Sequence, residues 1–291
     1  MKKRFLLLVF VIIASILQSN AQKRYPALGV ATSYDNDSVL YAAGFVYIEE
    51  TVRKLLSPSV EASVFREQVA QLRRSRCKIE TCNLFIPAEI KIVGPAVQEE
   101  RVLGYVDTVM QRARAAGIRL IVLGSGGARK LPDGMTPAEA KPAFIALCRK
   151  MAQIAARYDC TIAMENLNST ETNFINTLQE ANEVVTAIAH PRFKLTADIY
   201  HMLKEGETAA SIEKAGANLV HCHIAEREKR TAPGVAGDDF RPYFAALKQI
   251  GFKGRIMVES RWGNIAAECG PAIAYLQQQL AAAYDKGYTS K

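Results

Sequence analysis

Short apolar runs alternate along this sequence with longer segments in which apolar residues recur at helical spacing. The runs have the length of β-strands, and most of them end in a glycine or a polar residue. The expected strands are 25–32, 44–49, 78–85, 118–124, 161–165, 194–198, 219–223 and 256–259. The expected helical segments are 35–43, 60–76, 99–116, 136–158, 177–189, 207–215, 239–250 and 266–285.

Two helix boundaries carry clear local signals. Gly117 follows the amphipathic segment 99–116 and is typical of a residue that ends a helix. Thr136, Pro137 and Glu139 form an N-terminal capping pattern, with proline at the first helical position.

Eight strand–helix alternations predict an α/β fold, a single-domain (β/α)8 TIM barrel over residues 22–291. A doubly wound open sheet is the alternative. That fold binds nucleotides through a glycine-rich turn after its first strand, and the segment 29–32, Gly-Val-Ala-Thr, is no such turn.

The first 21 residues predict a signal peptide instead of a part of the fold. Lys2, Lys3 and Arg4 precede an apolar run at 5–17, and small residues at 19 and 21 suit a cleavage site before Gln22. We therefore expect export, with the periplasm as destination and no membrane association after cleavage; an uncleaved N-terminal anchor is the alternative.

Charge and cysteine content exclude several classes of protein. The formal net charge is +8, of which three charges lie in the predicted signal peptide, so that the mature chain carries +5 without a basic block. We expect no nucleic-acid partner. The six cysteines are scattered without a Cys-x-x-Cys pair, which argues against thiolate zinc sites and a disulfide framework.

Four expected strands end in residues that bind metals. Because the carboxyl ends of all strands in a (β/α)8 barrel open on one face, the ends of neighbouring strands should meet there. Three clustered carboxylates would repel one another unless a cation lay between them. Oxygen-rich ligation with one imidazole favours one Mn²⁺, with Co²⁺, Mg²⁺ or Zn²⁺ as alternatives. The predicted ligands are Glu165, Asp198, His223 and Glu259.

The same positions resemble a known family. The sequence is similar to the xylose-isomerase-like TIM-barrel superfamily, and within it to sugar isomerases and ketose 3-epimerases of the D-tagatose/D-psicose type. The motifs that carry the resemblance are Glu165-Asn-Leu-Asn-Ser-Thr-Glu171, Asp198-Ile-Tyr-His201-Met, His221-Cys-His223-Ile-Ala-Glu226 and Met257-Val-Glu259.

The resemblance implies a metal-dependent isomerase or epimerase that acts on a non-phosphorylated ketose through an enediolate. Glu165 and Glu259 would be its acid/base pair, and Glu171 and His201 would bind the carbonyl end of the sugar. Glu49, the 124–127 loop and Arg230 are further candidates for the substrate pocket. His221 is added to them, although its place one layer deeper in the strand favours a supporting role.

Three other functions stay open at this point. A lyase or hydratase acting on 3-keto-glycosides would use the same metal site. An abasic-site endonuclease of the same superfamily would need more histidine ligands than a chain with four histidines supplies. A non-catalytic sugar-binding barrel would not need the carboxylate pair. The apolar C-terminal helix, at 273–284, allows either barrel packing or a homo-oligomer interface.

Overall fold

The computed structural model of the protein describes residues 25–285. In it the apolar runs pair in parallel, in chain order, into a closed barrel in which β1 also pairs with β8. The predicted TIM barrel is therefore confirmed, whereas the predicted signal peptide, 1–21, lies outside the described residues. The strands are β1 Ala27–Ala31, β2 Tyr47–Thr51, β3 Lys78–Asn83, β4 Leu120–Leu123, β5 Thr161–Glu165, β6 Phe193–Asp198, β7 Leu219–Ile224 and β8 Arg255–Val258.

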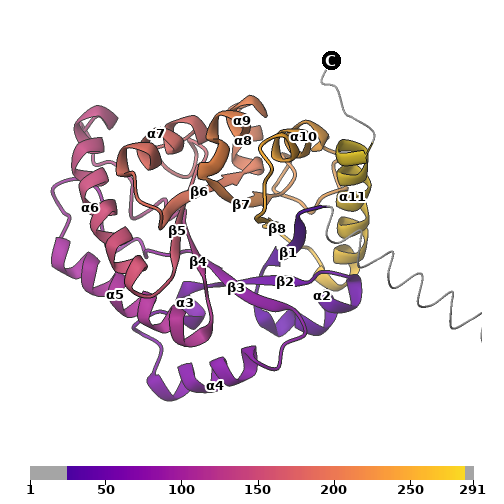
Figure 1. The fold of residues 1–291 in the computed structure, drawn as a ribbon, viewed down its shortest axis with the longest axis horizontal. Coiled ribbons are helices and arrows are strands. Elements are labelled where there is room, and N and C mark those ends of the chain that lie inside the picture. The colour runs from indigo at the N-terminus through magenta and orange to yellow at the C-terminus, as the bar shows by residue number, and fades with distance from the viewer. Residues whose placement is uncertain (1–24, 286–291) are drawn as a thin grey trace, which may run out of the picture.

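Helices surround the barrel as a ring (Figure 1). The helix α11 contacts both α10 and α2 and so closes this ring between the end and the start of the chain. The α-helices are α2 Asp37–Ala43, α3 Val52–Leu55, α4 Ala62–Leu72, α5 Glu99–Ala116, α6 Pro137–Arg157, α7 Leu178–Ile188, α8 Ile199–Glu205, α9 Ala210–Ala215, α10 Arg241–Gln249 and α11 Ile265–Asp285. The 3-10 helices are η1 Tyr34–Asn36 and η2 Gly216–Asn218.

Both predicted helix boundaries are present. Gly117 follows α5 with a φ of 81°, and its backbone N–H donates to the carbonyls of the last turn. Thr136 and Glu139 form a reciprocal capping box at the start of α6, with Pro137 as the first helical residue. These interactions satisfy backbone groups that a helix end would otherwise leave without partners.

Two differences from the expectation affect the residues at the carboxyl end of the barrel. The second strand begins at Tyr47 and not at residue 44, because Gly44 ends α2 with a φ of 103° and the chain must first leave the helix. The helix α8 follows β6 directly, where no helix was expected. Asp198 is both the last residue of β6 and the N-cap of α8, since its side chain accepts a hydrogen bond from the His201 N–H.

The apolar face of the C-terminal helix packs inside this chain. Ile273, Leu276 and Leu280 of α11 are buried and belong to the main hydrophobic core.

All six cysteines are buried free thiols. Within residues 25–285, no helix combines the length and the hydropathy that a membrane span requires.

Candidate functional site

The four predicted metal ligands lie together at the carboxyl end of the barrel. Glu165 ends β5, Asp198 ends β6, His223 is the penultimate residue of β7, and Glu259 directly follows β8. Asp198 and His223 are direct register partners across the two neighbouring strands. One ligand atom from each of the four residues lies within 4.8 Å of the others.

The imidazole of His223 lies at the centre of this cluster. Its Nδ1 is 2.6 Å from Glu165 Oε1 and 3.2 Å from Glu259 Oε2, whereas its Nε2 points away from them. Three carboxylates and one imidazole nitrogen converging on one point are a donor set that suits a divalent cation. The residues present therefore fit a metal ion, which Glu165, Asp198, His223 and Glu259 would hold.

Burial and crowding shift the acidity of these groups in different directions. Burial is the largest effect on Glu165 and Asp198, and together with the neighbouring Glu259 it raises the pKa of both. Burial acts in the same direction on Glu259, but His223 and Arg230 outweigh it and lower its pKa to about 2. Burial alone would lower the pKa of His223, and the surrounding carboxylates raise it well above its usual value.

These shifts predict that metal binding stabilises the protein more as the pH rises. A carboxyl group with a raised pKa in the folded state contributes stability at low pH, and this contribution is lost as the pH rises through that pKa. A bound cation would remove the cost of ionising Glu165 and Asp198. Metal-free protein should therefore lose more thermal stability between about pH 5 and about pH 8 than Mn²⁺-loaded protein. Melting curves with and without Mn²⁺ measure this, and a metal-induced rise in Tm that does not change with pH would contradict it.

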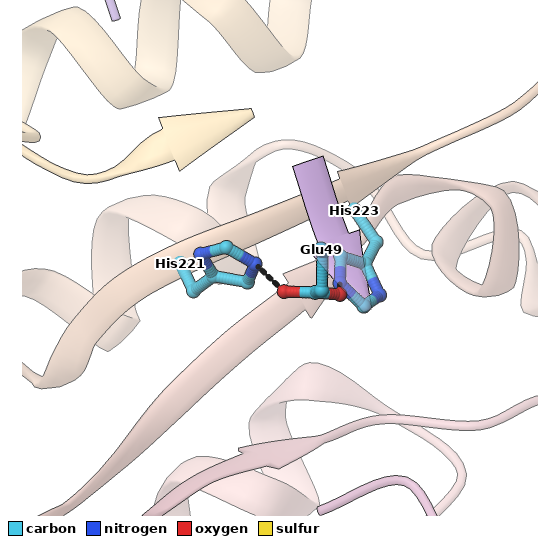
Figure 2. Close-up of side chains that lie close together, drawn as sticks. All are labelled: Glu49, His221 and His223. Atoms are coloured by element: carbon cyan, nitrogen blue, oxygen red, sulfur yellow. Dashed lines mark hydrogen bonds and ion pairs between the residues drawn. The ribbon is translucent and has the colours of Figure 1, made fainter. Parts of the chain in front are cut away.

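Glu49 and His221 form a second buried group with His223 (Figure 2). Figure 2 shows Glu49 of β2 between the two imidazoles of β7, with its carboxylate oxygens 2.7 Å from His223 Nε2 and 2.8 Å from His221 Nε2. All three side chains are at most 1% exposed. Neither Glu49 nor His221 lines the cavity above the cluster. The structure places both beside His223 and not in the wall of this cavity, and their expected role in substrate binding stays a prediction.

We interpret the buried group of Glu49, His221 and His223 as an ion pair between Glu49 and His223, and not as a second metal site. Burial would raise the pKa of Glu49, but the imidazoles of His223 and His221 outweigh burial and hold it below its usual value. The ionised carboxylate thus balances the positive charge of His223. It also receives the Nε2–H of that ring, which leaves Nδ1 directed at Glu165 and Glu259.

The remaining predicted residues line a cavity of about 870 Å³ in front of the cluster. Glu171, His201 and Arg230 all contribute to its wall, as do Gly124 to Gly127. Arg230 Nη2 is 2.5 Å from Glu259 Oε2, and its Nη1 is 3.3 Å from Glu171 Oε1. A larger cavity of about 1040 Å³ opens between the amino ends of the strands, where Arg119 and Arg192 pair with Asp159. Ligand sites of (β/α)8 barrels form at the carboxyl end, so we place the site in the smaller cavity.

His201 is held as a neutral hydrogen-bond donor. Its Nδ1 accepts the backbone N–H of Asn168 at 3.1 Å, so that the proton of the neutral ring resides on Nε2. That buried Nε2 lies 3.3 Å from Asp198 Oδ2, but the geometry there is not that of a hydrogen bond, and no other group in the described part of the chain satisfies it. Burial lowers the pKa of His201 to about 4, which keeps the ring neutral at pH 7. A donor in this state suits a substrate oxygen.

Three residues of the site were missed from the sequence. Asn83, at the end of β3, donates from Nδ2 to Glu259 Oε1 at 2.8 Å, and it is the same kind of polar strand end as the predicted ligands. Glu226 is fully buried and accepts the backbone N–H groups of Gly234 and Gly237, which holds the loop that carries Arg230. Arg129 is fully buried and donates to the carbonyl of Glu165 at 2.8 Å, and no local pattern marks it.

Gly124 gives the Glu165 carboxylate the space that it occupies. A Cβ at residue 124 would collide with Glu165 Oε2, although the backbone conformation of Gly124 is one that other residues can adopt. We expect Gly124→Ala to weaken Mn²⁺ binding at least about tenfold in a calorimetric titration. Gly104→Ala in α5 is the matched control, because a Cβ at that residue meets no atom within 4 Å. Equal Mn²⁺ affinities of Gly124→Ala and wild type would show that the Glu165 carboxylate does not need the space that Gly124 leaves.

Comparison with known proteins agrees with the fold. A family model described as xylose isomerase-like TIM barrel matches residues 39–285. The L-ribulose 3-epimerase of Methylomonas sp. (strain DH-1) is 37% identical over 117 residues, which are 40% of this chain and 41% of that protein. The 3-dehydro-D-guloside 4-epimerase of Escherichia coli (strain K12) is 32% identical over 128 residues, which are 44% of this chain and 47% of that protein.

Comparison with solved structures shows a similar fold over a larger part of the chain than the sequence alignments cover. A 3-keto-D-glucoside 4-epimerase from E. coli, in its apo form, superposes with a TM-score of 0.74 over 87% of this chain and 99% of that one, at 20% identity. This likeness concerns the fold. The sequence alignments, in turn, span less than half the length of both curated relatives.

Proposed function

Because this chain belongs to the xylose isomerase-like TIM barrel family, we propose that it is a metal-dependent sugar epimerase or isomerase. Its substrate would be a non-phosphorylated ketose or related keto sugar, bound in the cavity in front of Glu165 and Glu259. The observation that carries the proposal is the convergence of Glu165, Asp198, His223 and Glu259, of which Glu165 and Glu259 line this cavity.

The residue types of the cavity match this chemistry. A bound divalent cation would make the C–H bond beside the sugar carbonyl more acidic and stabilise the negative charge that develops on oxygen. Mn²⁺ is our choice of metal, with Co²⁺, Mg²⁺ and Zn²⁺ as alternatives. The Nε2–H of His201 and the guanidinium of Arg230 are donors for sugar oxygens.

Glu165 and Glu259 are suited to move the proton. They come from β5 and from the end of β8, so they approach a bound sugar from two sides of the barrel mouth. Their pKa values shift in opposite directions, which fits one carboxyl group that removes a proton and another that returns one. Glu171 would orient the sugar, since it faces the same cavity and contacts Arg230.

Incubation with keto sugars in D₂O tests the proposal. Free ketoses and 3-keto-glycosides are incubated with Mn²⁺-loaded protein, and the products are followed by NMR. Deuterium beside the carbonyl together with two epimers supports the proposal, and movement of the carbonyl marks the isomerase form. Absence of deuterium incorporation in every keto sugar would contradict it.

A lyase or hydratase acting on 3-keto-glycosides is the second candidate. The relative that acts on a 3-dehydro-D-guloside and the extent of the cavity beyond the carboxylates favour it. Loss of the aglycone or addition of water in the same NMR experiment identifies this activity.

The predicted signal peptide would place the proposed reaction outside the cytoplasm. The motif at 1–21 supports a periplasmic enzyme for which sugars without phosphate are available. Amino-terminal sequencing of protein from the periplasmic fraction tests this, and a sequence that begins near Gln22 is the expected result.

A further inference from the structure

The cavity continues beyond the carboxylates along an apolar wall. Its volume of about 870 Å³ lies in the upper part of the range of sites that enclose drug-sized molecules. The polar groups described above line one part of it, and the segment after β3 lines another part. The residues of this wall, called the apolar wall below, are Leu84, Ile86, Pro87, Ala88, Ile90 and Pro58.

Leu84 is the unusual residue of the apolar wall. Its φ is 52°, in the left-handed region that branched apolar residues rarely occupy. Its side chain is nevertheless 56% exposed, and among the exposed large apolar residues of 25–285 it is the one that lines this cavity. A strained backbone that holds an apolar side chain open to solvent points to a ligand that covers it.

The apolar wall is held at a fixed distance from the carboxylates. Leu84 follows Asn83, whose side chain donates to Glu259. Tyr105 donates its hydroxyl proton to the Phe85 carbonyl at 2.9 Å, and the Ile86 N–H donates to Ser125 Oγ at 2.9 Å. The polar floor and the apolar wall are therefore parts of one rigid site.

We propose that the natural substrate is a keto-glycoside whose aglycone is neutral and apolar and packs against the apolar wall. This inference rests on the proposed function and narrows its substrate class. A free monosaccharide at the polar end would leave Leu84 in water, whereas an aglycone bonded to the sugar would cover it. Arg53 and Glu89 at the rim carry opposite charges, so the rim favours neither an anionic nor a cationic aglycone.

Two probes that differ in the aglycone alone test the inference. The deuterium exchange of phenyl 3-keto-glucoside and methyl 3-keto-glucoside is compared as kcat/KM with Mn²⁺-loaded protein. We expect the phenyl compound to be favoured by at least about tenfold, the effect of extra apolar contact in a pocket. Equal values for the two probes would overturn the proposed aglycone site and leave the proposed epimerase intact.

Leu84→Asn should remove most of this preference. Asparagine tolerates a positive φ, so the substitution removes the apolar side chain and keeps the backbone conformation. The ratio of the two kcat/KM values should fall about tenfold. Val64→Asn in α4 is the matched control, because Val64 is 43% exposed and lies outside the cavity. An unchanged ratio in Leu84→Asn, or an equal fall in Val64→Asn, would contradict the role of the apolar wall.

A binding experiment distinguishes a failure of this inference from a failure of the proposed function. If neither keto-glucoside exchanges deuterium, saturation-transfer NMR with phenyl glucoside and methyl glucoside decides the question without turnover. Saturation of the phenyl protons by wild type and its loss in Leu84→Asn would support an aglycone site in a protein of another activity. Absence of saturation in wild type would overturn the inference.

Discussion

Glu165→Gln should reduce deuterium exchange in a keto sugar by at least about 10³-fold. The substitution keeps the size of the side chain but removes the charge that lies 2.6 Å from His223 Nδ1. In our proposal it would thereby remove a metal ligand and a proton carrier at once. The large effect follows because the carboxylate is 7% exposed and water cannot replace it.

Exchange rates and metal content are measured on the same samples. Mn²⁺ occupancy should fall together with the rate, and Asp198→Asn should lower occupancy in the same way. Glu183→Gln is the control, because Glu183 forms an exposed ion pair with Lys141 on the outer face of the ring of helices. A Glu165→Gln protein that exchanges deuterium within about threefold of wild type would show that Glu165 does not carry the proton.

Glu49→Gln should weaken Mn²⁺ binding by about 10-fold to 100-fold, although Glu49 does not touch the metal position. The carboxylate accepts the Nε2 proton of His223 and balances the charge of that ring. Glutamine keeps the volume but supplies no charge, so His223 would lose the partner that directs Nδ1 at the site. A 100-fold loss of affinity would also remove about 2.7 kcal/mol of metal-induced stabilisation at saturating metal.

Glu50→Gln is the matched control for this prediction. Glu50 is the next residue of β2 and is equally buried, but its side chain accepts the N–H groups of Tyr34 and Thr51 on the other face of the strand. Calorimetric titration with Mn²⁺ should give near wild-type affinity for Glu50→Gln. If both variants lose affinity equally, the effect comes from general disturbance of β2; if neither does, Glu49 does not position His223.

The positions of the metal-competent residues could be predicted because a parallel barrel brings strand ends together. Once the period of strands and helices was recognised, the last residue of each strand had to lie at one rim. Glu165 and Asp198 end their strands as expected, and His223 and Glu259 lie within one residue of a strand end. The capping residues of α5 and α6 could be predicted equally well, because local hydrogen bonds determine those helix boundaries.

The depth of Glu49 could not be read from the sequence. A strand expected at 44–49 places this residue at the rim, but β2 runs from Tyr47 to Thr51. The shift moves Glu49 two residues below the strand end and into the barrel, where it meets His221 and His223. The error lies at the carboxyl end of the strand, because two consecutive glutamates, Glu49 and Glu50, gave no sign that pairing continues to Thr51.

Arg129 and Leu84 were missed for a different reason. Both lie in irregular segments after strands, where side-chain direction depends on tertiary contacts and not on periodicity. Arg129 reaches the carbonyls of Glu165 and Ile175 from the loop after β4. Leu84 directly follows β3 with a φ of 52° and lines the cavity, and no sequence pattern marks that conformation.

Deuterium incorporation by metal-stripped and reconstituted protein tests the central claim most directly. Protein treated with a chelator, and the same protein with one equivalent of Mn²⁺ restored, are incubated in D₂O with a 3-keto-glucoside and followed by NMR. Our account predicts deuterium at the carbon beside the carbonyl with the reconstituted protein, and its absence with the stripped protein and with Glu165→Gln. Equal incorporation by stripped and reconstituted protein would contradict it.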